Sequence, residues 1–235
     1  MKTKLLALAA LALLASSAFA ATPTYLWRIY SPGVKGAAAA APASNVFATW
    51  NPSDVSPSMI LSGGNLVAVG NGAWASVRAT QGLSSGKWYW ESTISGANDT
   101  NSGWFIGAGT STFNLNSYTG GSASSLGWYL GHGYYLTWSG ATASAAPAAA
   151  TYSVGTTFMV AMDMDNDAIY VGVNGVWNGG GVPTSGATKT GAALTGFTGT
   201  VFPSLTAYAT QSTANFGATP FVYPVPAGYH AGVFQ

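Results

Sequence analysis

Hydrophobic and polar residues alternate with a period of two through residues 156–177. Every second residue from 158 to 164 is apolar, and so is every second residue from 169 to 173. Because successive side chains of a strand face opposite ways, these two runs predict strands with one apolar face each. Asp165-Asn166-Asp167 favours a turn between them, and Asn174-Gly175 is a strong signal for a two-residue hairpin turn. The stretch therefore predicts an antiparallel meander.

Short alternating segments separated by turns continue in both directions from this meander, beginning at Phe47. In one of them, Trp88 and Trp90 fall on one face, and Tyr89 and Glu91 on the other. The segments predicted as strands are 60–61, 66–69, 74–80, 87–94, 103–109, 126–130 and 134–138. Strands at this spacing, with no helical period after residue 20, predict an all-β sandwich or barrel.

The first 20 residues are typical of a secretory signal peptide. A basic start precedes an apolar run at 5–15 and the sequence AFA at 18–20, which is an A-x-A cleavage site before Ala21. The alternative is an uncleaved membrane anchor, but the run is shorter than the roughly 20 residues that span a bilayer. We therefore expect a secreted or periplasmic mature chain with no membrane span.

A short N-terminal extension follows the signal peptide. Residues 25–30 alternate like a strand, and residues 37–44 are rich in Ala and Pro. The segment 22–35 either docks onto a larger assembly or adds an edge strand to its own domain, and periodicity alone does not say which. The predicted organisation is a signal peptide at 1–20, a strand and linker at 21–46, and a β-sandwich domain at 47–235.

The composition narrows the possible functions. Charged residues make up 6% of the chain, against about a quarter in ordinary proteins, while aromatic residues make up 13%. The aromatic content argues against disorder, so we expect a folded domain with a neutral surface of Ser, Thr, Asn and Gly. The net charge of +1 disfavours nucleic-acid binding. The absence of cysteine excludes disulfides, thiol catalysis and thiolate metal sites.

Six segments, taken in order, resemble the SPRY domain family over roughly residues 47–230. They are GKWYWES at 86–92, GWFIGAG at 103–109, LGWYLGHGYYLTWSG at 126–140, VGTTFMVAMDMDNDAIYVGVNGVWNGGG at 154–181, FPSLTAY at 202–208 and NFGATPF at 215–221. The resemblance implies a concanavalin-like jelly roll, which is a sandwich of two antiparallel sheets. It also implies noncatalytic binding of proteins or peptides through loops at one end. The signal peptide and the low charge favour a secreted bacterial or phage-borne member.

The acidic sequence Asp163-x-Asp165-x-Asp167 begins like a calcium-binding loop. Such loops carry Gly at the sixth position and Glu at the twelfth, where this chain has Ala168 and Asn174. The pattern therefore favours a structural turn, with a weak cation site as the minor alternative. We expect no cofactor.

Few residues could serve as acids or bases in catalysis. Glu91 follows an aromatic strand and could be one carboxylate of a glycoside hydrolase or lyase, but no E-x-D-x-x-E pattern supplies a second one. The G-x-S-x-G elbow of serine hydrolases is also missing. We expect Glu91 to pair with Lys or Arg across the sheet, and His132 to be an exposed residue at a glycine-flanked hairpin tip.

Aromatic residues close to turns are the candidate ligand contacts. Most of Trp74, Trp88, Trp90, Trp104 and Phe105 are expected in the core or in the packing between the sheets. Loops 95–102, 110–125 and 131–141 are expected to cluster at one end of the sandwich, with 178–190 nearby. The candidate binding residues are Tyr118, Trp128, His132, Tyr134, Trp138 and Trp177, with Asn98, Asp99 and Asn101 for polar specificity. For each aromatic residue, core packing is the alternative.

These observations favour a noncatalytic recognition module, secreted or virion-associated, which binds a protein or a glycan on a cell or virion surface. The alternative is a carbohydrate-active enzyme on the same architecture, since fold does not decide function. Two carboxylates within about 10 Å of each other in a cleft would favour the enzyme.

Overall fold

A computed structural model describes residues 44–96, 104–121, 124–129, 134–136, 142–143 and 152–235, with side chains omitted for 134–136 and 142–143. The segments predicted as signal peptide and N-terminal strand lie outside these residues. Ser44–Gln235 forms one compact unit. Among the described residues, no helix has the length and apolarity needed to cross a membrane.

The described part is almost entirely β-structure. Its elements are β1 (Trp50–Val55), β2 (Met59–Ser62), β3 (Val67–Gly70), β4 (Ala75–Ala79), β5 (Lys87–Ile94), β6 (Trp104–Gly109), β7 (Ser125–Tyr129), β8 (Tyr134–Leu136), β9 (Thr142–Ala143), β10 (Thr157–Asp163), β11 (Ala168–Val173), β12 (Val176–Trp177), the short 3₁₀ helices η2 (Asn178–Gly180) and η3 (Pro183–Thr188), β13 (Leu194–Thr195), β14 (Phe202–Ala207) and β15 (Gln211–Asn215).

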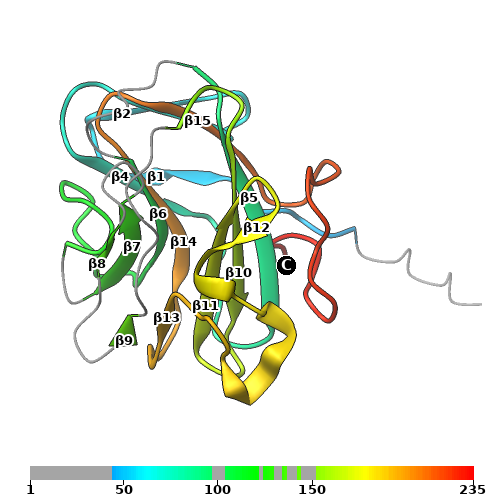
Figure 1. Ribbon diagram of the computed structural model, residues 1–235. Coiled ribbons are helices and arrows are strands. Elements are labelled where there is room, and N and C mark those ends of the chain that lie inside the picture. Colours follow the sequence, from blue (N-terminus) through cyan, green and yellow to red (C-terminus); the bar gives the residue numbers. More distant parts are fainter. Residues whose placement is uncertain (1–43, 97–103, 122–123, 130–133, 137–141, 144–151) are drawn as a thin grey trace, which may run out of the picture. The chain divides into compact units, whose positions relative to one another are not determined.

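These strands form two antiparallel sheets packed face to face (Figure 1). The six-stranded sheet has the order β1-β4-β14-β6-β7-β8. The nine-stranded sheet has the order β2-β3-β15-β5-β10-β11-β13-β9, with β12 added to β11. The expected fold class, a two-sheet antiparallel sandwich, is confirmed.

The main core lies between the two sheets and is rich in large aromatic side chains. Trp50, Trp90 and Phe158 are fully buried there, together with Trp128. On β5, Trp90 faces this core, whereas Tyr89 faces the outer side of the nine-stranded sheet and joins a second apolar cluster. The alternation predicted for 87–94 is therefore confirmed.

The central strand β10 is buried on both faces, where the sequence predicted one apolar face. Phe158, Val160 and Met162 lie in the main core, while Met159 and Ala161 lie in the second cluster on the outer side. The second cluster is covered by residues 216–235, called the C-terminal segment below, together with neighbouring residues such as Trp177. This irregular covering segment explains the difference, because a strand pattern does not reveal what packs on its other face.

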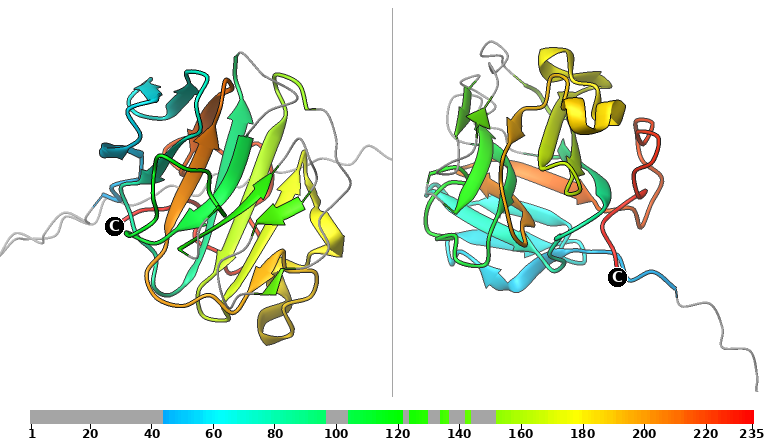
Figure 2. Two further views of the ribbon diagram at one scale, coloured as in Figure 1. Left: turned by 90° about the vertical axis from the view of Figure 1, so that its left-hand side faces the viewer. Right: turned by 90° about the horizontal axis from the view of Figure 1, so that it is seen from below.

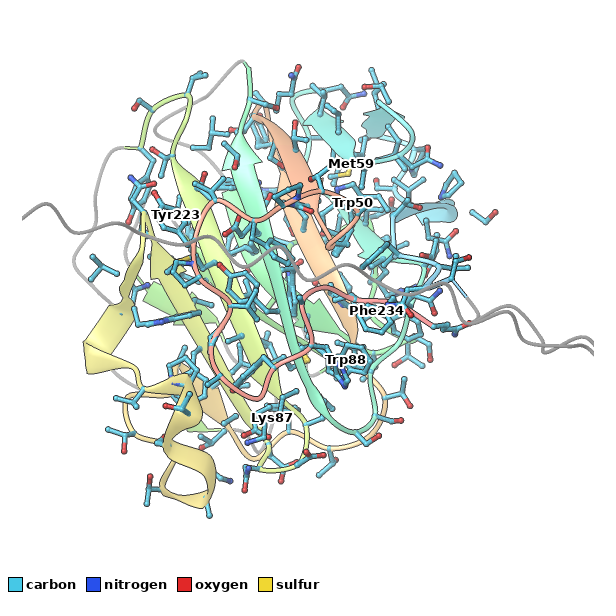
Figure 3. All side chains as sticks on the ribbon, turned by 90° about the vertical axis from the view of Figure 1, so that its right-hand side faces the viewer. Trp50, Met59, Lys87, Trp88, Tyr223 and Phe234 are labelled. Atoms are coloured by element: carbon cyan, nitrogen blue, oxygen red, sulfur yellow. The ribbon has the colours of Figure 1, made fainter. Side chains whose placement is uncertain are left out.

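The C-terminal segment runs across the outer face of the nine-stranded sheet, between the labelled Tyr223 and Phe234 in Figure 3. Its contacts are spread along its length. Tyr229 Oη donates to the Pro183 carbonyl at 3.0 Å, and the His230 backbone N–H donates to the Lys87 carbonyl at 2.8 Å. The His230 ring lies against Trp88, with centroids 4.4 Å apart. The segment is thus an integral layer of the domain.

The two ends of the compact unit meet. Val46 N–H donates to the Gln235 carbonyl at 3.1 Å, and Gln235 N–H donates back to the Val46 carbonyl at 3.2 Å. The rings of Phe47 and Phe234 pack edge to face beside this pair, with centroids 5.4 Å apart. Residues near the start of the compact unit and its last residues therefore form a small antiparallel bridge.

The turn between β11 and β12 has the conformation predicted for Asn-Gly. Asn174 has φ 48° and Gly175 has φ 86°, and positive φ at both central residues is what a type I′ turn requires. The Asn174 side chain adds a bond, because its Oδ1 accepts the Thr157 backbone N–H at 2.9 Å. The predicted meander at 156–177 is confirmed as β10, β11 and β12.

Candidate binding surface

Five aromatic rings pack together on the outer side of the six-stranded sheet, and we call Trp74, Phe105, Tyr118, Tyr129 and Tyr208 the aromatic cluster. Trp74 is its centre, with ring centroids 5.4 to 6.1 Å from the other four rings, all in edge-to-face geometry. Phe105 stacks on Tyr118 at 5.2 Å and on Tyr129 at 4.2 Å. Phe105 and Tyr129 are buried, whereas Trp74, Tyr118 and Tyr208 are partly exposed.

Strand pairing explains why these rings meet. Trp74 directly precedes β4, and Tyr208 directly follows β14, its antiparallel neighbour. Phe105 lies near the start of β6 and pairs with Tyr129, the last residue of β7. All four positions therefore lie at the same end of the sheet. Since Trp104 and Ile106 face the main core, Phe105 between them faces outward.

The fifth ring, Tyr118, comes from the segment 110–121, which lies over the outer face of the six-stranded sheet (Figure 2, left). Arg78 of β4 holds this segment. Its Nε and Nη2 donate to both carboxylate oxygens of Asp54 at 2.6 Å, and its Nη1 donates to the carbonyls of Thr110 and Phe113 at 3.0 and 2.8 Å. Arg78 is 5% exposed, so it acts as a buried clamp between β1, β4 and the segment.

The backbone on both sides of Tyr118 is anchored by hydroxyl groups from the sheet. Ser76 Oγ donates to the Ser117 carbonyl, and the Thr119 N–H donates to Thr206 Oγ1 at 2.7 Å. Ser76, Thr119 and Thr206 are all fully buried. These bonds fix the ring of Tyr118 in place before any ligand arrives, which lowers the entropy cost of binding.

The predicted binding residues divide into three groups. Tyr118 belongs to the aromatic cluster, and Tyr134 is paired with Tyr129 in the backbone register, although its side chain is not described. His132, Trp138, Asn98, Asp99 and Asn101 lie outside the described residues. Trp128 and Trp177 lie elsewhere in the sandwich.

The prediction for Trp128 as a ligand contact is wrong. Trp128 is 1% exposed and packs against Phe158 in the main core, because it alternates with the outward-facing Tyr129 on β7. Trp177 is partly buried, but it packs toward Tyr89 on the outer side of the other sheet. It therefore does not extend the aromatic cluster.

Two of the three partly exposed residues of the cluster, Trp74 and Tyr208, were not among the candidates. Trp74 was expected in the core, and Tyr208 was not singled out. Both stand beside turns, after Asn71-Gly72-Ala73 and at the end of FPSLTAY. That position is the signal that could have identified them. The strand order that brings the two together could not be read from either stretch.

The expected cross-strand ion pair of Glu91 is also wrong. Glu91 is 1% exposed, and its carboxylate accepts Tyr89 Oη at 2.8 Å and the backbone N–H groups of Val222 and Tyr223 at 2.9 and 2.8 Å. Burial, reinforced by the hydrogen bond to Glu91, raises the pKa of Tyr89 well above its usual value. Glu91 therefore anchors the C-terminal segment to the sheet.

Two of the three aspartates of the acidic turn, Asp163 and Asp165, have structural contacts within the described residues. Asp163 is fully buried, accepts the N–H groups of Asp165 and Asn166 at 3.1 Å, and pairs with Lys87 at 2.9 Å. Asp165 Oδ1 accepts the Gly86 N–H at 2.6 Å. Within the described ranges, no three acidic or histidine side chains are grouped so as to hold a metal ion. The interpretation as a turn is therefore supported by these bonds.

Comparisons with known proteins identify the fold. No family model matches the chain, and no curated protein matches it. Among solved structures, the SPRY domain of human HERC1 is similar with a TM-score of 0.51 and 15% identity, over 73% of this chain and 99% of that one. The TRIM65 PSpry domain is similar with a TM-score of 0.51 and 13% identity, over 72% of this chain and 92% of that one. The chain therefore has a SPRY-like fold.

Proposed function

We propose that this chain is a noncatalytic binding module that recognises a ligand on a cell or virion surface through the aromatic cluster. The observation that carries the proposal is the pre-organised platform of Trp74, Tyr118 and Tyr208 at one end of the sandwich. Rigid, partly exposed aromatic residues on a sheet scaffold are typical of recognition surfaces. The resemblance to the SPRY domain family, which implies binding, agrees with it.

The state of the acidic groups supports binding rather than catalysis. Both Glu91 and Asp163 are buried. The Glu91 carboxylate accepts hydrogen bonds from Tyr89 and from the Tyr223 backbone, and the Asp163 carboxylate accepts one from the Asp165 backbone and pairs with Lys87. Asp163 pairs in register with Lys87, four residues along β5 from Glu91. At about 3.3 Å per residue, the two carboxylates are roughly 13 Å apart, which exceeds the separation used by glycosidases. The carbohydrate-active enzyme is therefore the less favoured alternative.

We propose further that the mature protein is secreted and begins at Ala21, on the strength of the signal-peptide pattern at 1–20. Intact mass spectrometry of the exported protein checks this. A mass that includes Met1 and the apolar run would contradict it. We also propose that the protein is of bacterial or phage origin. Residues 22–35 would dock onto a larger assembly.

The test of the binding proposal compares the mature chain with Trp74→Ala, Tyr118→Ala and Tyr208→Ala on a panel of bacterial and animal cells. Trp177→Ala, which removes a partly buried tryptophan on the other sheet, is the matched control. Variants are first shown to be folded by thermal unfolding. We expect the cluster variants to lose surface binding by about thirtyfold and the control to keep it. Equal binding by all four variants would contradict the proposal.

The same titration carries a second expectation. Because no charged side chain belongs to the aromatic cluster, affinity should change less than about twofold between low and high salt. Tyr134→Ala and Trp138→Ala then test whether residues 130–141 contribute to the surface. A steep loss of binding in salt would place the contact surface on the charged residues instead.

A further inference from the structure

We propose that the ligand of the aromatic cluster is a neutral, soluble oligosaccharide chain, whose sugar rings stack on Trp74, Tyr118 and Tyr208. The inference rests on the proposed binding function and names the class of ligand. It is carried by three features of the cluster: its lack of charge, its unused polar atoms, and the angles between its rings.

The lack of charge selects a neutral ligand. Arg78 is the cation of β4 behind the cluster, and its Nε, Nη1 and Nη2 are all engaged by Asp54, Thr110 and Phe113. Lys87 begins β5, whereas Ile94 ends it and pairs with Ser212 near the start of β15, which follows Tyr208 in the chain. Lys87 therefore lies at the other end of β5 from the cluster. An acidic sugar desolvated against the rings would have no counter-charge among the described residues, which is costly.

The polar atoms of the three exposed rings are available to a ligand. Within the described residues, Trp74 Nε1, Tyr118 Oη and Tyr208 Oη have no hydrogen-bond partner. These three atoms are not buried, so a ligand can reach them. Each residue therefore combines a partly exposed aromatic ring with an unbonded polar group at its rim. A sugar needs this combination, because it has an apolar C–H face bordered by hydroxyl groups.

The angles between the rings select a soluble chain over a flat crystalline surface. Trp74 is inclined by 63° to Tyr118 and by 64° to Tyr208. Rings so inclined form a bent platform, which can follow a twisted or curved oligosaccharide but cannot lie flat on a planar crystal face. The packing of Phe105 and the anchored backbone around Tyr118 hold these angles.

Among the described residues, the lack of exposed large aliphatic side chains beside the platform argues against a protein as the primary ligand. A stable protein interface covers about 800 Å² on each partner and has an apolar centre. The exposed large aliphatic residues of the described chain, which would extend such a centre, are outside the cluster and the segment 110–121. They are Val46, Ile60, Val154, Val176, Val182 and Val222.

The experiment applies the mature chain to immobilised neutral oligosaccharides (gluco-, galacto-, manno- and N-acetylglucosamine-based) and to two acidic ones, sialyllactose and oligogalacturonate. Microcrystalline cellulose provides the planar surface. Each oligosaccharide that binds is titrated by calorimetry against the unchanged chain and against four variants. Trp74→Ala removes a ring, whereas Tyr118→Phe and Tyr208→Phe keep the rings and remove the hydroxyl groups. Trp177→Ala is the control.

We expect a neutral oligosaccharide to bind, with about a thirtyfold loss for Trp74→Ala, about a fivefold loss for each Tyr→Phe variant and no change for Trp177→Ala. Preference for an acidic oligosaccharide or for crystalline cellulose, or no binding to any neutral probe, would overturn the inference. If cell binding survives periodate oxidation of surface glycans but still requires Trp74, the ligand is a protein: the inference fails and the proposed function stands. If no binding depends on Trp74, both fail.

Discussion

The buried carboxylate of Glu91 accepts a hydrogen bond from the backbone N–H of Tyr223 at 2.8 Å. This bond joins β5, at the centre of the nine-stranded sheet, to an irregular segment 132 residues further along the chain. With the bonds from Val222 and Tyr89, it places one carboxylate beneath the C-terminal segment, where three donors converge. One acidic side chain therefore anchors the part of the C-terminal segment around Val222 and Tyr223 to the sheet.

Glu91→Gln should lower the free energy of unfolding by about 2 kcal/mol, because a neutral amide accepts fewer hydrogen bonds and brings its own N–H toward a backbone donor. Chemical denaturation measures the loss. Hydrogen exchange should also show the amides of 216–229 opening before those of β5 and β10. The control is Asp167→Asn, another acid-to-amide change, at a side chain with no hydrogen bond within the described residues. Equal effects of the two substitutions would contradict the anchoring role.

Arg78→Lys should destabilise the domain by about 2 kcal/mol and weaken ligand binding as well. Lysine keeps the charge but cannot reach Asp54, Thr110 and Phe113 together, since it lacks the planar fork of arginine. Because the same clamp holds the segment that carries Tyr118, stability and affinity should fall together. Lys189→Asn, at a residue with φ 51° that asparagine tolerates, removes a positive charge elsewhere and should change neither by much. An unchanged affinity in Arg78→Lys would show that Tyr118 does not depend on the clamp.

Asn174→Val should cost about 1–3 kcal/mol, because a β-branched residue is strained at φ 48° and cannot accept the Thr157 N–H. Asn174→Gly separates the two effects, since glycine tolerates the backbone angle but also lacks the acceptor. Its loss should be smaller, near the 1 kcal/mol of one hydrogen bond. Thermal unfolding of the two variants gives the comparison. Equal melting temperatures would mean that backbone strain contributes nothing.

The domain should lose stability at alkaline pH. Burial raises the pKa of Tyr89 and of Tyr229 above the usual value of about 10. The unfolded chain therefore releases these protons first, so stability is complete below about pH 10 and declines as the pH rises above it. Each hydroxyl should contribute a slope of up to about 1.4 kcal/mol per pH unit. Tyr229→Phe should reduce the slope measured by urea unfolding at pH 8–11, and an unchanged slope would contradict the assignment.

Local patterns in the sequence were sufficient for some of the strands, such as β5, β10 and β11, and for one turn, whereas β1, β14 and β15 were not predicted from the alternation. The alternation in β10 and β11 and the Asn174-Gly175 signal depend on neighbours within a few residues, and the structure has both. The face assignment in β5 followed from the same period. These features are local because side-chain alternation and positive φ are set by the backbone of the segment itself.

The binding surface could be predicted only in part, because it is assembled from distant segments. Tyr118 was identified by its place beside a loop, but its neighbours Trp74 and Tyr208 are brought to it by the order β4-β14-β6-β7. Trp128 was assigned to the binding surface although it lies in the core. An alternating pattern shows that neighbouring side chains face opposite sides of the sheet, but it does not show which side is buried. The backbone donors to Glu91 are more than 130 residues away, on a segment without a periodic pattern.

The reciprocal hydrogen bonds of Val46 and Gln235 bear on how this domain can be used as a building block. Because Val46 and Gln235 are neighbours in space, a carrier protein could accept residues 46–235 as an insertion in one surface loop, with short connections on both sides. The same adjacency permits circular permutation, in which residues 46 and 235 are joined by a short linker and new ends are opened at an exposed turn such as Gly63-Gly64. The aromatic cluster, built from β4, β6, β7 and β14, would be carried intact in either arrangement.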